Sequence, residues 1–194
     1  MARRLCLKED GSYSAEQGIN TTRRYATMFG LDHPSGVEIF ENDPLLTTED
    51  PERSAMGQGT HSYTNVQLAR YVAAIANRGT VFELSLLDKL TDSDGNLITD
   101  YTPEVHSHIE AADSTWNAVQ TGMRRMITES SAKTIFSSLP VEVAGKTGTA
   151  QEDRSRSNLL YFLCALQPSG NCGYSQHPLR LCRNQCGYLR KKGL

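Results

Sequence analysis

The chain has 194 residues, of which 38% are hydrophobic and 22% charged, a composition that suits one globular domain or most of a larger one. The formal net charge of −2 hides an asymmetry, since residues 1–153 carry 13 basic and 22 acidic side chains and residues 154–194 carry 7 basic and none acidic. No run approaches the roughly 18 apolar residues of a membrane span, and no apolar segment of a signal peptide follows the N-terminal arginines, so as written we expect cytoplasmic placement.

The first 60 residues are expected to combine helical pieces with a long loop. Helical patterns cover Met1–Leu7 and Asn20–Phe29, with a polar turn between them and Gly30 as a C-cap. No N-cap residue precedes the first pattern, so we expect the chain to start inside a helix, at an internal methionine of a longer gene. Residues 31–60 contain too many glycines and prolines for regular structure, and such a loop usually covers a site or is disordered.

Two helices and a hairpin are predicted in the middle of the chain. Thr64 and Gln67 form a capping box for the first helix, which ends at Gly79. Its apolar stripe is predicted to consist of Val66, Ala69, Val72, Ala73 and Ala76, widened by Leu68 and Ile75. Strand-like residues 81–90 and 97–98 flank the turn formers Asp94-Gly95, which indicates a hairpin. The second helix is capped at Asp113 or Ser114, and its core face is predicted to hold Trp116, Val119, Met123, Met126 and Ile127.

The strongest functional signal is the segment Val143-Ala144-Gly145-Lys146-Thr147-Gly148-Thr149-Ala150-Gln151. It is expected on or at the end of a strand, paired antiparallel with an apolar strand over 159–166. Lys146 lies between glycines, with hydroxyls on Thr147 and Thr149, so the segment suits an anionic group. A phosphate-binding loop would need its first glycine where Pro140 stands, and proline has no N–H. A Gly-kinked strand with a solvated lysine is the other alternative.

Several short motifs occur in one order along the chain. They are Tyr25-Ala26 to Phe29-Gly30-Leu31, Ser35-Gly36-Val37, Met56-Gly57-Gln58-Gly59, Asn65 to Gln67-Leu68-Ala69, Ala73 to Ala76-Asn77-Arg78-Gly79, and Ala144 to Gln151. In this combination, over roughly residues 20–170, the chain resembles the transpeptidase domain of penicillin-binding proteins. The resemblance implies an α/β (α+β) fold, an antiparallel sheet flanked by helices, of the serine β-lactamase/D,D-transpeptidase type and incomplete here. Residues 1–170 would be the C-terminal portion of that domain.

The resemblance also implies a function, D,D-transpeptidation of peptidoglycan stem peptides, with β-lactams acylating the same serine. Lys146 would supply positive potential for the substrate carboxylate, and Thr147 and Thr149 would hydrogen-bond it. Gly148 would let the substrate lie close as an added strand. The backbone N–H of Thr149 would be half of an oxyanion hole.

The nucleophile of the family is expected to lie outside this chain. The family's S-x-x-K and Ser-x-Asn motifs precede the matched region, and neither stands there. Ser130-Ser131-Ala132-Lys133 spells S-x-x-K, but it lies in the loop that enters the strand, whereas the nucleophile should open a buried helix. We therefore expect the chain to be inactive alone.

The last 24 residues, 171–194, show neither helical nor strand periodicity, and we expect an irregular or disordered tail from a reading frame lost near residues 170–172. An alternative function is a non-enzymatic zinc- or partner-binding module that uses Cys164, Cys172, Cys182, Cys186 and His177, although their spacings lack paired knuckles. Too few basic residues argue against nucleic-acid binding. Apart from the pair His106 and His108 beside a predicted strand, the histidines lack metal-ligand spacing, so neither a metal nor another cofactor is assigned. Gly57-Gln58-Gly59 is discounted as a dinucleotide fingerprint because its last position falls on Ser62.

Overall fold

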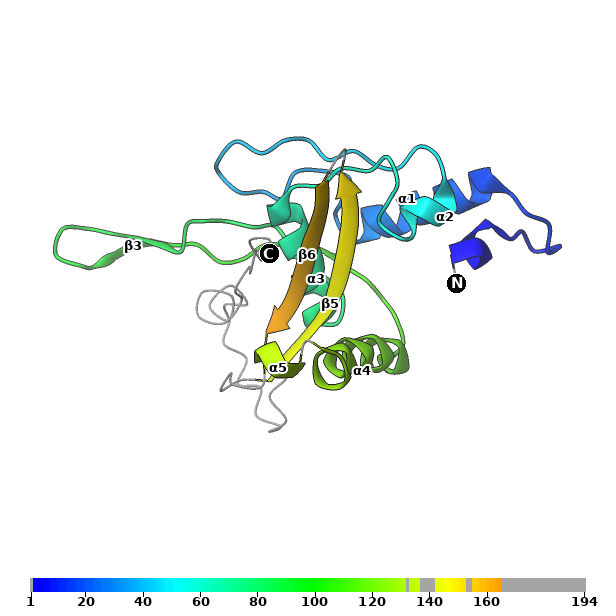
Figure 1. The fold of residues 1–194 in the computed structure, drawn as a ribbon. Helices are drawn as coiled ribbons and strands as arrows, with labels where there is room; N and C mark the ends of the chain where they lie inside the picture. Colours follow the sequence, from blue (N-terminus) through cyan, green and yellow to red (C-terminus); the bar gives the residue numbers. More distant parts are fainter. Residues whose placement is uncertain (1, 132, 137–141, 153–154, 165–194) are drawn as a thin grey trace. The chain divides into compact units, whose positions relative to one another are not determined.

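The computed structural model describes residues 2–131, 133–136, 142–152 and 155–164 (Figure 1). The chain divides into two compact units. The first unit holds Met1–Ala74 and Gly79–Ile109, and the second holds Ile75–Arg78 and Glu110–Leu194. In the described residues the strands form three two-stranded antiparallel sheets, pairing β1 with β4, β2 with β3 and β5 with β6. The predicted mixture of helices and antiparallel strands is therefore present.

The first unit begins with a 3-10 turn, Ala2–Cys6, followed by helix α1, Ala15–Met28. Ser14 is the N-cap of α1, since its hydroxyl accepts a hydrogen bond from the N–H of Gln17 at 3.2 Å. The helix therefore starts several residues before the predicted Asn20. Its end agrees with the prediction, because Gly30 takes a positive φ of 68° and its N–H donates to the carbonyl of Thr27.

The loop over residues 31–62 is held by polar contacts rather than by sheet pairing. It contains the short helix α2, Pro51–Ser54, and a single bridge between Leu45 and Ser62. Thr47 is 2% exposed, and its hydroxyl contacts the hydroxyl of Ser54. A Cβ on Gly59 would lie 2.8 Å from the Cα of Ser54, so the glycine is needed for close packing. This explains the glycine without any phosphate contact.

Helix α3, Asn65–Ala76, carries the capping box that the sequence predicts. The hydroxyl of Thr64 accepts from the N–H of Gln67 at 3.2 Å, and the Gln67 side chain accepts from the N–H of Thr64 at 2.8 Å. The predicted apolar stripe is partly wrong, because the buried face is rotated by one residue. Val72 and Ile75 are buried as predicted, but the face also holds Gln67, Arg70 and Ala74, while Ala69, Ala73 and Ala76 are exposed.

Two short sheets complete the first unit. Strand β1, Thr80–Phe82, pairs with β4, Val105–His108, with an irregularity between Val81 and Phe82. Strands β2, Lys89–Thr91, and β3, Leu97–Asp100, form the predicted hairpin around Gly95, which has a φ of 86°. The predicted strand over residues 81–90 is divided between β1 and the three-residue β2, and the return strand β3 runs from the predicted Leu97 to Asp100. Every residue of β2 and β3 is exposed.

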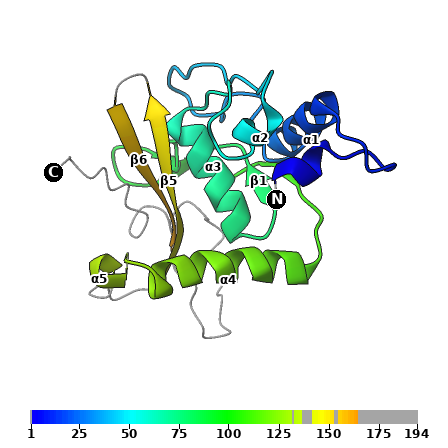
Figure 2. The same cartoon turned by 45° about the vertical axis from the view of Figure 1, so that its right-hand side comes forward.

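The second unit joins helix α4, Asp113–Glu129, to the hairpin of β5, Val143–Glu152, and β6, Ser155–Cys164. The N-cap residue of α4 is Ala112, which makes no side-chain hydrogen bond, so the predicted cap at Asp113 or Ser114 is wrong. Trp116 and Ile127 are buried as predicted, but Val119 is 40% exposed. Figure 2 shows α4 lying crosswise to the hairpin near the start of β5, beside the short helix α5, Lys133–Phe136. The predicted tail lies outside the described residues.

Candidate functional site

The predicted carboxylate-binding residues lie side by side on β5. Within this strand residues 143–145 are buried, whereas Lys146, Thr147 and Gly148 are exposed. The register pairs Lys146 with Tyr161 and Thr149 with Asn158 on β6. In the described residues, no strand pairs with the other edge of β5. The strand therefore changes from core to surface at the lysine.

The start of β5 is anchored to α4. Arg124 of α4 donates from Nη1 to the carbonyl of Val143 at 2.7 Å and from Nη2 to the carboxylate of Glu142 at 3.0 Å. Below this contact Val143 packs with Ile127 and Phe136, with Met126 at the margin of the cluster. The lysine segment thus extends from a strand whose first residues are fixed by a hydrophobic cluster and by an arginine.

Lys146 and Thr147 are consecutive residues of the extended strand β5, and both are exposed. The ammonium Nζ of Lys146 contacts the carbonyl oxygen of Thr147. An exposed ammonium next to backbone can be reached by a carboxylate from solution, because its four-carbon stem is flexible.

The S-x-x-K sequence Ser130 to Lys133 lies where helix α4 ends. Ser130 is the C-cap of α4, and its hydroxyl donates to the carbonyl of Met126 at 2.5 Å. The N–H of Lys133, the first residue of α5, donates to the carbonyl of Ser130 at 3.1 Å. Ser130 is exposed and closes a helix, whereas the nucleophile of the resembled family opens a buried one.

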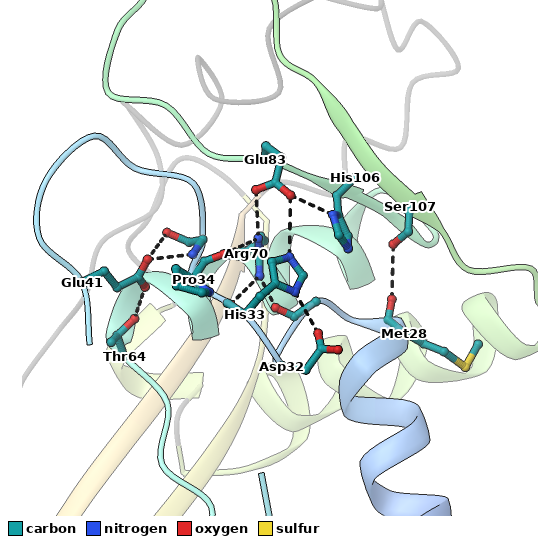
Figure 3. A network of polar contacts seen from close by, with 12 residues as sticks. Met28, Asp32, His33, Pro34, Glu41, Thr64, Arg70, Glu83, His106 and Ser107 are labelled. Atoms are coloured by element: carbon teal, nitrogen blue, oxygen red, sulfur yellow. Dashed lines mark hydrogen bonds and ion pairs between the residues drawn. The ribbon is translucent and has the colours of Figure 1, made fainter. Parts of the chain in front are cut away.

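A second polar cluster, in the first unit, was not predicted. It joins His33, Glu83 and His106, whose nitrogen and oxygen ligand atoms lie within 4.8 Å of one another (Figure 3). The Nδ1 atom of His106 lies 2.7 Å from Oε1 of Glu83, and the Nε2 atom of His33 lies 3.6 Å from the same oxygen. No spacing in the sequence signals this cluster, because the residues come from a turn after α1, the end of β1 and strand β4.

The cluster is surrounded by further hydrogen bonds. Arg70 of α3, whose side chain is 1% exposed, donates to Oε2 of Glu83 at 3.3 Å and to the carbonyl oxygens of Gly30, His33 and Pro34. Nδ1 of His33 lies 2.8 Å from the carboxylate of Asp32. The buried guanidinium of Arg70 therefore holds the turn that contains His33, because it donates to carbonyl oxygens within that turn.

Comparison with known proteins identifies the family of this chain. Residues 12–162 match the family model described as the penicillin-binding protein transpeptidase domain. The match covers most of the chain, and the chain belongs to this family. The resemblance stated from the motifs and the expected fold class are both confirmed.

Two curated proteins of Bacillus subtilis (strain 168) are similar to the chain. Penicillin-binding protein H is 30% identical over 159 residues, which is 76% of this chain and 22% of that protein. Penicillin-binding protein 2A is also 30% identical over 159 residues, 73% of this chain and 22% of that protein. The chain thus spans about a fifth of the length of these relatives.

Solved structures show the same fold. Penicillin-binding protein 2B of Streptococcus pneumoniae strain R6 superposes with a TM-score of 0.63 at 23% identity, over 75% of this chain and 26% of that one. An imipenem acyl-enzyme of penicillin-binding protein A from M. tuberculosis gives a TM-score of 0.63 at 22% identity, over 77% and 36% of the two chains. Among the described helices, none has the length and apolar content needed to cross a membrane.

Proposed function

We propose that this chain supplies the substrate-carboxylate wall of the acyl site in a penicillin-binding transpeptidase, which cross-links peptidoglycan stem peptides. The observation that carries the proposal is the exposure of Lys146, Thr147 and Gly148 directly after the buried, anchored start of β5. Membership in the transpeptidase family supports the same role. The parent protein would act at the outer face of the cytoplasmic membrane, on stem peptides that end in D-Ala-D-Ala.

The chemistry of the proposed wall follows from the charges and donors on β5. The ammonium of Lys146 attracts the terminal carboxylate of the peptide, and the hydroxyl of Thr147 donates a hydrogen bond to it. Gly148 has no side chain, so an extended peptide can approach the backbone and add to the edge of the strand. The N–H of Thr149 then stabilises the oxyanion that forms when a serine attacks the carbonyl, an interaction worth about 3–4 kcal/mol in related chemistry.

The attacking serine and its general base are proposed to lie on residues outside this chain. Ser130 supports this assignment, because it caps the end of α4 and donates to the carbonyl of Met126. An acyl-enzyme requires a nucleophile that a base can deprotonate, and in the family that serine opens a buried helix, whereas Ser130 is exposed and ends a helix. We therefore propose that the chain alone forms no acyl-enzyme.

Labelling with a fluorescent penicillin tests the missing nucleophile. The native chain should show no covalent band after denaturing electrophoresis, and a full-length penicillin-binding protein in the same reaction should be labelled. A band on the native chain that disappears in Ser130→Ala would place the nucleophile at Ser130 and refute this part of the proposal.

Peptide binding tests the carboxylate wall independently of acylation. An N-acylated D-Ala-D-Ala peptide with a free carboxylate should shift the NMR amide signals of residues 146–149, and the same peptide with a C-terminal amide should not. Lys146→Met should weaken the binding of the free carboxylate, whereas Lys133→Met, which removes a lysine outside β5, should leave it unchanged. Equal binding of the acid and the amide would refute the role of Lys146.

A further inference from the structure

We propose that His33, Glu83 and His106 bind a Zn²⁺ ion, in a site that is separate from the β5 segment and independent of the acyl chemistry. Two imidazole nitrogens and one carboxylate oxygen are a ligand set that Zn²⁺ accepts, with water in the fourth position. The three ligand atoms already lie within 4.8 Å of one another.

The backbone brings the three residues together. Strand β1 pairs with β4, and just beyond Phe82 the N–H of Glu83 donates to the carbonyl of Glu104 at 2.9 Å, which places Glu83 beside the start of β4. The N–H of Leu84 donates to the carbonyl of Ser35 at 2.8 Å, which ties the segment just after β1 to the turn holding His33. Rigid backbone contacts of this kind pre-organise a metal site, so little ordering is needed when the ion binds.

The orientation of His33 favours a cation beside its ring. A carboxylate only accepts hydrogen bonds, so the contact of 2.8 Å from Nδ1 to Asp32 places the ring hydrogen on Nδ1. In neutral His33 the lone pair then lies on Nε2, which is buried without a hydrogen-bond partner and faces Oε1 of Glu83 at 3.6 Å. Two acceptors that face each other across this distance are stabilised by a positive ion between them. The Asp32–His33 pair also matches the carboxylate–histidine arrangement that orients metal ligands.

Glu83 divides its two oxygens between Arg70 and the histidines (Figure 3). Oε2 accepts from Arg70 at 3.3 Å, and Oε1 faces both imidazoles. Arg70 therefore holds the carboxylate without occupying the ligand oxygen, and the carboxylates of Glu83 and Asp32 outweigh its single charge. Gly36 contributes by having no side chain, since a Cβ there would lie 2.7 Å from Oε2 of Glu83.

The geometry needs only small side-chain movements to take the ion. Zn–N and Zn–O distances of about 2.0–2.2 Å in a tetrahedron separate two ligand atoms by roughly 3.4 Å. Nδ1 of His106 must move away from its present 2.7 Å contact with Oε1, and its hydrogen moves to Nε2, so that Nδ1 offers a lone pair. Nε2 of His33, at 3.6 Å from Oε1, is already at the required separation. The side chains of His33, Glu83 and His106 are 31–32% exposed, so an ion can reach them from solution.

Metal titration of the full chain tests the site. The probe is Co²⁺ followed by its visible d–d absorption, with Zn²⁺ displacement followed by calorimetry. To exclude thiolate ligands, a second full-length chain carries serine in place of Cys164, Cys172, Cys182 and Cys186. Both chains should bind one Co²⁺, and the serine-substituted chain should do so without a thiolate-to-cobalt charge-transfer band. Loss of binding in the serine-substituted chain would move the site to the cysteines and overturn the proposal.

Single substitutions in the serine-substituted chain identify the ligands. His33→Gln and His106→Gln should each weaken Co²⁺ binding at least tenfold, and Asp32→Asn should weaken it roughly 10- to 100-fold through the orientation of His33. His61→Gln and His108→Gln are the matched controls and should bind as tightly as the parent. The proposal would be overturned if His33→Gln and His106→Gln bound Co²⁺ as tightly as the serine-substituted chain, or if that chain bound no Co²⁺.

A readout without substitutions covers the case in which a variant does not fold. Long-range ¹H–¹⁵N spectra of the imidazoles in the native chain should show Zn²⁺-dependent shifts for two histidines and unchanged signals for the others. Circular dichroism melting should show a higher Tm with Zn²⁺ present, because an ion that binds only the folded state stabilises it. An unchanged set of imidazole signals in folded protein would contradict the site regardless of how the variants behave.

Discussion

Ser35 donates two hydrogen bonds to one carboxylate oxygen of Glu41, from its backbone N–H and from its hydroxyl, each at 2.7 Å. Ser35 is fully buried, and the other oxygen of Glu41 accepts from the hydroxyl of Thr64 at 2.5 Å. Because Thr64 caps α3, this single carboxylate ties the loop after α1 to the start of that helix. Polar contacts thereby hold a long glycine- and proline-rich segment in which Leu45 and Ser62 form an isolated β-bridge.

The hydrogen bonds to Glu41 predict a pH-dependent stability of the first unit. Burial alone would raise the pKa of the Glu41 carboxyl, but hydrogen bonds from Thr64 and Ser35 and the charge of Arg70 hold it below its ordinary value of 4.5. A carboxyl whose pKa is lower in the folded state stabilises the protein above its unfolded pKa. This stabilisation is lost as the pH falls from about 4.5 through the folded pKa.

The measurement compares urea unfolding of the native chain and Glu41→Gln across this pH range. At neutral pH the variant should be less stable by about 1.5–3 kcal/mol, the typical contribution of hydrogen bonds to a charged group. The difference should shrink on acidification, because the native carboxyl then becomes protonated and resembles the amide. A difference that stays constant from neutral to acidic pH would show that the charge of Glu41 contributes nothing.

Arg70 is predicted to be the most sensitive position of α3. Arg70→Met removes the donors to three backbone carbonyls and to Glu83, and it leaves the carbonyls facing an apolar side chain. We expect a loss of about 3–5 kcal/mol in the free energy of unfolding, as for a buried ion pair that loses one partner. Arg70→Lys should recover part of this loss, since an ammonium keeps the charge but not the planar fork.

The control for Arg70 is Arg23→Met, because Arg23 is exposed on α1 and its substitution should change stability by less than about 0.5 kcal/mol. Urea unfolding followed by far-ultraviolet circular dichroism measures both. If Arg70→Met and Arg23→Met cost the same, the guanidinium of Arg70 does not hold the turn.

The buried face of α3 also shows where reasoning from the sequence succeeds and where it fails. The capping box of Thr64 and Gln67 was predictable because both partners lie within one turn and their donors and acceptors are obligatory. The buried face was not, since a hydrophobic pattern assigns arginine and glutamine to the surface. Arg70 is buried because its acceptors lie in the loop after α1, which the local sequence does not specify.

The two candidate sites differ in the same way. Lys146 to Thr149 are consecutive, so one strand pattern and one motif were enough to locate them on β5. The cluster of His33, Glu83 and His106 depends on the pairing of β1 with β4 and on a turn held by Arg70. Such tertiary proximity leaves no spacing signal in a single sequence.

Gln120 of α4 forms a polar link to the end of α3 inside the second unit. Its side-chain amide donates to the carbonyl oxygens of Ile75 and Ala76, both at 3.0 Å, and it is 7% exposed. These carbonyls belong to the last turn of α3, where intrahelical donors run out. The carbonyl of Ile75 also accepts from the N–H of Arg78 at 3.4 Å, so the loss of Gln120 falls mainly on the carbonyl of Ala76. Gln120→Leu should therefore reduce the free energy of unfolding by about 1–3 kcal/mol, the cost of leaving a buried acceptor unpaired.

Thr121→Leu is the matched control for Gln120→Leu, because Thr121 is its exposed neighbour on α4. Trp116 is buried on the same helix, so its fluorescence follows unfolding of this unit. A Gln120→Leu variant as stable as Thr121→Leu would mean that solvent satisfies the two carbonyls.

Replacing Gly18 or Gly122 by alanine is predicted to have opposite effects on the stability of the folded chain. Both glycines lie inside helices, α1 and α4, where alanine is favoured over glycine by about 0.8–1.0 kcal/mol on helix propensity alone. A Cβ at Gly122 would meet nothing within 4 Å, so Gly122→Ala should stabilise the chain by about that amount. A Cβ at Gly18 would collide with Sγ of Cys6 and lie 2.7 Å from Cβ of Pro51.

Gly18→Ala should therefore destabilise the first unit by about 1–3 kcal/mol, because overpacking outweighs the propensity gain. Cys6 is fully buried, and Cys6→Ala in the Gly18→Ala background removes one of the two collisions, so it should recover part of the loss beyond what Cys6→Ala alone changes. Thermal melting of the native chain, the two single variants and the double variant measures the coupling between Gly18→Ala and Cys6→Ala. If Gly18→Ala raised the Tm as Gly122→Ala does, α1 would not pack against Cys6 and Pro51 as closely as the structure places them.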